Sequence, residues 1–253
     1  MKTTKIEWTD STWNPTTGCT KISEGCQHCY AAIMALRLKA MGIKKYSSGF
    51  ELVLHPKTLN EPLRWKQPRT IFVNSMSDLF HKDIPFEFID QVFDVIKCTP
   101  HHRYQVLTKR ADILKQYFAT REVPSNVWLG VTVENQKVKN RINDLRDIPA
   151  TVKFLSCEPL LENLENIDLT NINWVIVGGE SGTNARPMKE EWVLNIEEQC
   201  RIQGAAFYFK QWGTWGADGI KRNKKENGKL LCGHVKQEYP SSNLLDSVFM
   251  DKF

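Results

Sequence analysis

The sequence has 253 residues and a formal net charge of +5, from 34 lysines and arginines against 29 aspartates and glutamates. Its 41% hydrophobic and 25% charged residues are typical of a globular protein and exclude a disordered or fibrous chain. Its apolar runs fall short of the roughly 20 residues that span a bilayer, and its N-terminus lacks the apolar stretch of a signal peptide. We therefore expect a cytoplasmic protein that has no membrane partner.

Short apolar, β-branched or aromatic runs alternate along the chain with longer amphipathic runs. The short runs predict eight strands, at residues 6–8 or a little beyond, 51–54, 70–74, 103–107, 127–133, 152–155, 174–177 and 206–209. The longer runs predict helices at residues 29–41, 57–65, 86–97, 110–119, 136–145 and 189–203, with a further short helix after Pro159. The helical period of hydrophobic residues is clearest in residues 86–97.

This alternation predicts an α/β fold with parallel strands and right-handed crossovers. Eight such units would close a (β/α) barrel, six would form a partial barrel, and an open doubly wound sheet is the competing architecture. Polar residues follow at least six of the predicted strands, which favours a barrel because barrel enzymes carry their chemistry at the carboxyl ends of the strands. We predict a complete or nearly complete TIM-like barrel in residues 1–212, with residues 213–253 as a C-terminal extension packed on it.

The most specific pattern is a C-x6-C-x2-C run formed by Cys19, Cys26 and Cys29, which precedes a predicted helix. In a cytoplasmic protein such cysteines are expected as thiols or metal ligands rather than as disulfides. Three thiolates suit zinc or the irons of an iron–sulfur cluster. A structural zinc site normally has a fourth protein ligand, whereas three ligands to a four-iron cluster leave one iron open to bind another molecule. Zinc, a cluster and structural thiols all remain as interpretations.

The closing C-x2-C pair, its position after the first predicted strand and the barrel rhythm behind it resemble the radical S-adenosylmethionine superfamily. With the segment 13–19 (WNPTTGC) before the motif, the whole chain resembles a phage-associated family of radical SAM-like proteins with a three-cysteine motif. The superfamily usually has the spacing C-x3-C-x2-C, so the six-residue first gap is a departure. The resemblance implies a [4Fe-4S] cluster, S-adenosyl-L-methionine cleaved to a 5′-deoxyadenosyl radical, and an electron donor such as flavodoxin or ferredoxin.

Two strand ends carry residues that the resemblance suggests as cofactor contacts. Gly178, Gly179 and Glu180 follow an apolar run and are similar to the Gly-Gly-Glu segment that holds the methionine amine in that superfamily, although there it follows the second strand. Thr132 and Glu134 end the fifth predicted strand and are candidate ribose contacts. The alternatives are a tight turn at the glycines and a buried strand with a helix-capping glutamate.

Other strand ends carry further candidates for binding the cofactor. Ser75 and Asp78 follow the third predicted strand, together with His81, and Lys109 follows the fourth. Cationic groups at these ends could neutralise a cofactor carboxylate or a substrate phosphate. The alternative is that they are ordinary cations on the protein surface. Further cationic residues at strand ends are Arg110, Arg186 and Lys210.

Cys157 and Glu158 follow the sixth predicted strand and are the candidate catalytic residues. A cysteine facing a radical chamber can donate a hydrogen atom, and the adjacent glutamate can act as an acid or base. The alternative for Cys157 is an inert buried thiol, which is the commoner situation.

The basic balance, the phage association, and Trp212 and Trp215 near the barrel rim suggest a nucleic acid or nucleotide as substrate, through modification or lesion repair. Packing on the rim is the alternative for both tryptophans. Two other functions stay open. One is a zinc-stabilised nucleic-acid-binding module without catalysis. The other is a barrel hydrolase that uses strand-end carboxylates, namely Asp78, Glu134, Glu158 and Glu180.

Overall fold

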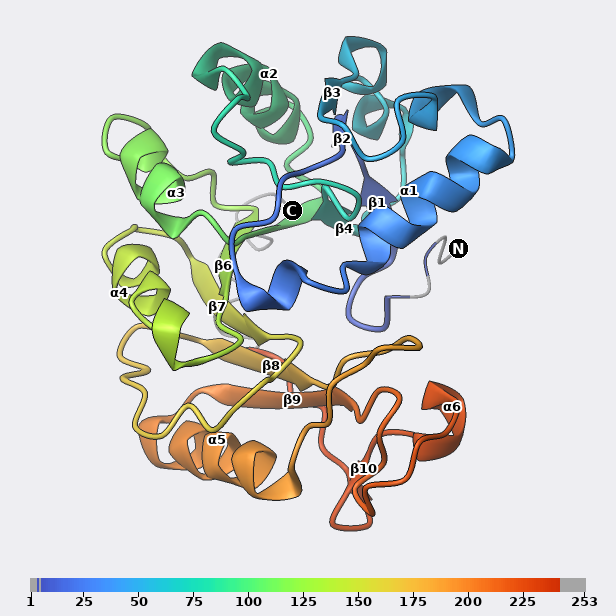
Figure 1. Ribbon diagram of the computed structural model, residues 1–253. Helices are drawn as coiled ribbons and strands as arrows, with labels where there is room; N and C mark the ends of the chain where they lie inside the picture. Colours follow the sequence, from blue (N-terminus) through green and yellow to red (C-terminus); the bar gives the residue numbers. More distant parts are fainter. Residues whose placement is uncertain (1–3, 5, 242–253) are drawn as a thin grey trace. The chain divides into compact units, whose positions relative to one another are not determined.

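A computed structural model describes residues 4 and 6–241 of the chain (Figure 1). Its main sheet has seven strands in the order β1-β4-β5-β6-β7-β8-β9. These strands are β1 (Ser11–Trp13), β4 (Thr70–Val73), β5 (Arg103–Thr108), β6 (Val127–Thr132), β7 (Val152–Cys157), β8 (Trp174–Gly178) and β9 (Ala206–Gln211). The helices are α1 (Tyr30–Ala40), α2 (Phe86–Lys97), α3 (Ala111–Phe118), α4 (Arg141–Arg146), α5 (Glu190–Gln203) and α6 (Lys224–Asn227). None of the helices found in these residues is long and apolar enough to cross a membrane.

The strand order is that of a partial (β/α) barrel, so the prediction of a complete or nearly complete barrel is wrong. Within the described residues β1 and β9 form the two edges of the sheet. The predicted strand at 51–54 does not join this sheet, because β3 (Val53–Leu54) pairs antiparallel with β2 (Thr16–Thr17). Seven strands therefore remain where eight were expected.

The first predicted strand was also misplaced, since β1 begins at Ser11 rather than at residue 6. Trp8 is buried and packs edge-on against Phe72, so its hydrophobicity reflects packing rather than a strand. The hydroxyl of Thr9 donates to the carbonyl oxygens of Ser11 and Thr70, which holds the chain in a bend just before β1.

Three predicted helices are absent as continuous α-helices. The one at 136–145 is divided into a 3-10 turn, Gln136–Val138, and α4, which begins only at Arg141. Residues 57–65 form two 3-10 turns, Pro56–Thr58 and Pro62–Arg64, because Pro62 has no N–H to continue a helix. After Pro159 the chain turns without a helix: the side chains of Asn163 and Asp168 accept the backbone N–H groups of Glu165 and Thr170 and so compete with helical hydrogen bonds.

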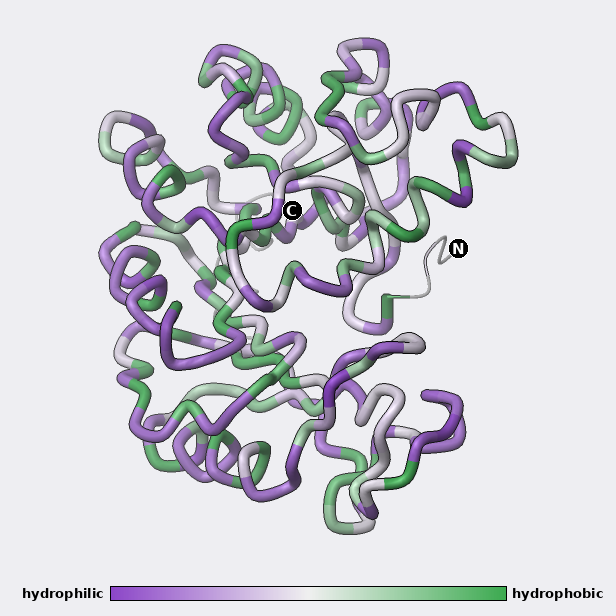
Figure 2. The backbone as a smooth tube through the Cα atoms, in the orientation of Figure 1, coloured by the Kyte–Doolittle hydropathy of each residue, from purple (hydrophilic) through white to green (hydrophobic). Residues whose placement is uncertain are grey.

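The residues divide into two compact units. The first contains the described parts of Met1–Ile22, Cys29–Gly130 and Ile148–Thr151. In it β1, β4 and β5 pair in parallel, with Trp13 opposite Val73 and Val73 opposite Val106. Helix α2 keeps both of its predicted bounds, and Figure 2 shows hydrophobic and hydrophilic residues alternating along it.

The second unit contains Ser23–His28, Val131–Asp147 and the described part of Val152–Phe253. In it β7, β8 and β9 pair in parallel, and every residue of β7 and β8 is buried. Their near-continuous apolar sequence is typical of parallel strands that are covered on both faces. Residues after Gly213 include the short antiparallel pair β10 (Leu230–Leu231) and β11 (His234–Val235). Gln237 forms a bridge to Tyr208 of β9, which fixes this part of the chain to the sheet edge.

Candidate functional site

The segment 18–29, which we call the cysteine loop, begins at Gly18 directly after β2. Gly18 has a φ of +81°, and a Cβ atom there would lie 1.9 Å from the carbonyl oxygen of Glu51. The N–H of Gly18 donates to the carbonyl oxygen of Met76, and the carbonyl oxygen of Gly18 accepts from the Ser77 hydroxyl. Only glycine fits this close approach without displacing backbone. The position of Cys19 is therefore tied to the loop that follows β4.

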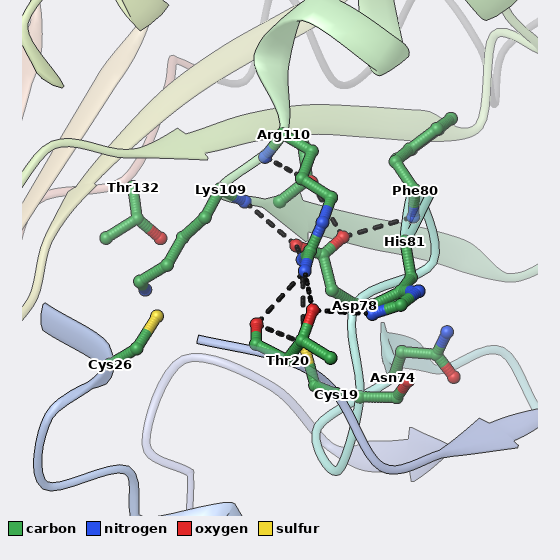
Figure 3. A network of polar contacts seen from close by, with 12 residues as sticks. Cys19, Thr20, Cys26, Asn74, Asp78, Phe80, His81, Lys109, Arg110 and Thr132 are labelled. Atoms are coloured by element: carbon green, nitrogen blue, oxygen red, sulfur yellow. Dashed lines mark hydrogen bonds and ion pairs between the residues drawn. The ribbon is translucent and has the colours of Figure 1, made fainter. Parts of the chain in front are cut away.

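Arg110 holds the next two residues of the cysteine loop, within the first unit (Figure 3). Its Nη1 lies 3.5 Å from the Sγ of Cys19 and 2.9 Å from Oδ2 of Asp78. Its Nη2 donates to the carbonyl oxygen of Thr20 at 3.0 Å and to the hydroxyl of the same residue at 3.1 Å. Although burial opposes the charge of the guanidinium, the carboxylate of Asp78 raises the pKa of Arg110. A permanent cation therefore lies against the first thiol.

Asp78 has both of its carboxylate oxygens occupied by the chain. Oδ1 accepts from the hydroxyl of Thr108 at 2.7 Å and from the N–H of Phe80 at 3.1 Å. Oδ2 accepts from the N–H of Lys109 at 3.1 Å and from Arg110. The carboxylate, which is 7% exposed, thus orients the guanidinium.

His81 completes this network from the same loop. Its Nδ1 accepts the N–H of Asp83 at 3.2 Å, so in the neutral ring Nε2 carries the proton and donates to the Thr20 hydroxyl at 2.8 Å. Burial and the nearby cation of Arg110 lower the pKa of His81. The ring therefore acts as a neutral donor to the cysteine loop.

A pocket of about 550 Å³ opens beside Cys19 in the first unit. Its lining includes Cys19, Thr20 and His81 together with Leu36 of α1 and Phe50. The first thiol of the motif is therefore reachable from a pocket rather than enclosed in the core.

In the second unit a different carboxylate holds the middle of the cysteine loop. Glu134, which is 0% exposed, accepts a hydrogen bond from the hydroxyl of Ser23 and another from the N–H of Gly25 at 3.2 Å, both through Oε1. Its other oxygen pairs with Nη1 of Arg141 at 3.0 Å. Arg141 also donates to the carbonyl oxygen of Thr132 at 2.8 Å. The end of β6 and the start of α4 thus fix the 3-10 turn Glu24–Cys26.

A third pair, also in the second unit, holds the end of this segment. Glu180 accepts two hydrogen bonds from the Arg186 side chain, at 2.6 and 2.9 Å, and lies 3.2 Å from Nδ1 of His28. Arg186 in turn donates to the carbonyl oxygen of Glu24 at 3.1 Å and to the side chain of Gln27 at 3.4 Å. Burial opposes the negative charge of Glu180, but the hydrogen bonds from Arg186 and His28 hold the pKa of this carboxyl below its usual value.

Three carboxylate–arginine pairs therefore hold successive parts of the cysteine loop, and each carboxylate follows a strand, β4, β6 or β8. Sequence reasoning named the three carboxylates as candidate cofactor contacts but missed Arg141 as a partner. The spacing between acid and arginine was an available signal in two of the pairs, because Glu134 precedes Arg141 by seven residues and Glu180 precedes Arg186 by six. Nothing local in the sequence indicated Thr20, Ser23 or His28.

All seven cysteines lie in the described part of the chain and none forms a disulfide. Cys19, Cys26 and Cys29 are each partly exposed, and Cys29 caps α1 beside Ala31 and Ala35. Three partly exposed thiols, one of them beside a guanidinium, are a donor set that fits an iron–sulfur cluster. Among the residues that the structure describes, no group of three His, Cys, Asp or Glu side chains is arranged as a set of metal ligands.

The two candidate catalytic residues lie at the end of β7. Cys157 is fully buried, and burial raises the pKa of its thiol. Glu158 pairs with Lys210 of β9 at 2.7 Å and accepts from the hydroxyl of Ser156 at 3.3 Å. A Cβ atom on Gly178 would lie 2.8 Å from Oε1 of Glu158, so this glycine makes room for the carboxylate. The structure brings these residues together in the second unit.

The remaining candidates are engaged in local contacts. Ser75 donates to the side chain of Asn14 at 3.2 Å and accepts from the hydroxyl of Tyr30 through its carbonyl oxygen. Gly179 allows a close approach of the backbone at Trp212, whose carbonyl oxygen would lie 1.9 Å from an added Cβ atom. Trp212 is itself buried, and its indole N–H donates to Leu230, so it packs in the core rather than offering a stacking face.

The fold and this site define an α/β protein with a partial barrel and a three-cysteine loop after its first parallel strand. The chain belongs to the family described as "Protein of unknown function (DUF5131)", which it matches over residues 3–240. No curated protein matches it.

Solved structures of spore photoproduct lyase match the chain with low sequence identity and low TM-scores. The complex with dinucleoside spore photoproduct is 14% identical, with a TM-score of 0.36, and the match covers 73% of this chain and 59% of that chain. A mutant of the same lyase with bound AdoMet and dinucleoside spore photoproduct is also 14% identical, with a TM-score of 0.38 over 76% and 61% of the two chains. The chain thus spans about three fifths of the length of these lyase structures.

Proposed function

We propose that this chain is a radical S-adenosylmethionine enzyme in which Cys19, Cys26 and Cys29 hold a [4Fe-4S] cluster. The observation that carries the proposal is the cysteine loop itself: it has three partly exposed thiols, and carboxylate–arginine pairs hold the Cys19 sulfur and the chain around Cys26. A loop held by so many charged hydrogen bonds is typical of a preorganised ligand site. A surface loop with incidental cysteines would have no need of them.

The cluster with S-adenosyl-L-methionine would supply one-electron cleavage of a carbon–sulfur bond, with the electron taken from a donor such as flavodoxin or ferredoxin. Within the described residues, the ammonium of Lys109 makes no hydrogen bond or ion pair with the protein. It is our candidate to bind the cofactor carboxylate. Glu158 and Lys210 would orient polar groups at the ends of β7 and β9.

Anaerobic reconstitution with iron and sulfide tests the proposal. The wild-type chain should bind about four irons, become brown and, with reductant and S-adenosylmethionine, release 5′-deoxyadenosine. The triple variant Cys19→Ala, Cys26→Ala, Cys29→Ala should lose the iron and the product. Cys98→Ala, which removes an exposed cysteine outside the loop, should keep both. A colourless wild-type protein that binds one zinc, or a triple variant that keeps its iron, would reject the cluster.

We further propose that Cys157 donates a hydrogen atom to a substrate-derived carbon radical at the end of the reaction: its S–H bond breaks, a C–H bond forms on the substrate, and the remaining thiyl radical returns to the thiol by taking one electron from the same electron donor and one proton from water. Its raised pKa keeps the S–H bond that such a donation requires. Cys157→Ala should therefore retain cofactor cleavage but lose the completed product, whereas Cys200→Ala, at another buried thiol, should retain both. Equal product yields from the two variants would remove this role.

The substrate class that we propose is a nucleic acid or nucleotide. Support comes from the net charge of +5 and from the basic segment 221–225, in which Lys224 and Lys225 are exposed and Lys221 lies 4.8 Å from the ring of Trp215. Binding of a labelled single-stranded oligonucleotide should weaken as salt rises from 50 to 200 mM, because phosphate contacts release counterions. Affinity that does not change with salt would contradict this class.

A further inference from the structure

We propose that Arg110 is a positioning residue for Cys19, which fixes the direction of its sulfur and raises the reduction potential of the cluster that the sulfur would hold. The inference rests on the proposed function, because it concerns the state of a bound cluster. It goes further by assigning to Arg110 a role that differs from that of the arginines beside Cys26.

The geometry gives this guanidinium two tasks at once. Its Nη1 contacts the Cys19 sulfur at 3.5 Å, and its Nη2 binds both oxygens of Thr20, the residue that follows. The side chain and the next peptide group are therefore held by one rigid planar group. A planar fork of donors loses less freedom per hydrogen bond than a flexible lysine would.

Asp78 fixes the guanidinium from the other side. The pair is buried, with side-chain exposures of 6% for Arg110 and 9% for Asp78. Asp78 is itself held by the Thr108 hydroxyl and by two backbone N–H groups. Arg110 thus has one arrangement open to it, and the contact with Cys19 follows from that arrangement.

The contact with sulfur has an electronic consequence. Reduction adds negative charge to a cluster, and a hydrogen bond or cation at a ligand sulfur stabilises that charge. Around Cys26 the corresponding arginines, Arg141 and Arg186, contact carboxylates and backbone carbonyls, and the Cys26 sulfur lies 3.8 Å from the Ser23 hydroxyl. Arg110 is therefore the arginine expected to influence the potential directly.

Potentiometric titration of reconstituted protein, followed by electron paramagnetic resonance, tests the inference. Arg110→Lys keeps a cation but loses the fork. The double variant Asp78→Asn, Arg110→Gln removes both charges, so that neither is left buried without a partner. Arg121→Gln is the matched control, since Arg121 pairs with Asp90 in the same unit and has no contact with the cysteine loop.

The double variant should be at least tenfold harder to reduce, which corresponds to a midpoint lower by 59 mV for one electron. Arg110→Lys should fall between it and the wild type, and Arg121→Gln should match the wild type. A double variant that unfolds at the control's temperature but cannot take up iron also supports the positioning role. Potentials and spectra unchanged in both Arg110 variants would overturn the inference and leave the proposed function standing. A wild-type chain that takes up no iron overturns both.

Discussion

The two parts of the cysteine loop are held by the same kind of ion pair but at different atoms. In the first unit Arg110 contacts the sulfur of Cys19 directly and is oriented by Asp78. In the second unit the pairs built on Glu134 and Glu180 bind the backbone and the polar side chains around Cys26. One part of the loop therefore has a cysteine sulfur held directly, and the other has its backbone path held.

This difference separates two ways in which a protein supports a ligand. A charge beside the sulfur alters the electronic properties of whatever the sulfur binds. Hydrogen bonds to the backbone alter the conformation of the loop and the stability of the fold. Changes in the second unit should thus appear mainly as lost stability, whereas changes at Arg110 should appear mainly as an altered potential.

The largest effect on stability is expected from Glu134→Ala. The substitution leaves the Arg141 side chain, 9% exposed, without its charged partner and removes the acceptor for Ser23 and Gly25. Breaking a buried pair in this way costs about 3–5 kcal/mol. Urea denaturation measures the loss. The control Glu198→Ala breaks the exposed pair with Arg201 and should leave the free energy of unfolding almost unchanged, because solvent screens exposed pairs. Similar losses in both variants would contradict the structural role of Glu134.

Gly18→Ala should also weaken the fold, at the other part of the loop. The alanine Cβ would meet the carbonyl of Glu51, and L residues disfavour the positive φ. We expect a loss of about 3 kcal/mol together with reduced iron uptake. Gly42→Ala is the matched control, because Gly42 has a similar φ of +73° but nothing within 4 Å of an added Cβ atom, and it should cost about 1 kcal/mol. Equal losses of stability for the two variants in thermal unfolding would show that the close contact between Gly18 and the Glu51 carbonyl does not matter for stability.

Arg186→Gln should lower the free energy of unfolding at pH 7 by about 2 kcal/mol, through the loss of charged hydrogen bonds to Glu180. Since Arg186 lowers the pKa of Glu180, its stabilisation is present above the ordinary glutamate pKa and is lost as the pH falls through the lowered value. Wild type and variant should therefore converge once the pH lies well below the lowered pKa of Glu180. Arg201→Gln, at the exposed pair with Glu198, provides the comparison in urea denaturation at pH 7 and at that lower pH. A difference that persists at low pH would contradict the ionic origin.

The smallest effect concerns thiols that neither part of the loop uses. Burial raises the pKa of Cys157, and it raises that of Cys200 to about 12. Neither thiol should react with iodoacetamide in the folded protein at pH 8, whereas the exposed Cys98 and Cys232 should react readily. Peptide mass spectrometry before and after unfolding measures the four rates. Rapid labelling of Cys157 in the folded chain would contradict its burial.

Much of the fold could be predicted from local pattern. The hydrophobic period of α2 defined both of its bounds, and six of the predicted strands overlap β4 to β9 because apolar β-branched runs between polar residues are strong strand signals. The partial barrel could not be predicted, since Val53–Leu54 has the composition of a strand of the main sheet but pairs with Thr16–Thr17. Pairing depends on which chain segment lies alongside, and composition does not record that.

The sequence by itself determined that three cysteines lie on one loop and that carboxylates follow the strands. Only the tertiary structure decided what those carboxylates do. Asp78, Glu134 and Glu180 looked like groups awaiting a cofactor, yet arginines and loop atoms occupy oxygens of all three. Some of these partners lie more than 100 residues away in the chain, as Glu134 does from Ser23. A buried carboxylate must find a cation or donors to remain charged, and folding alone determines which ones come within reach.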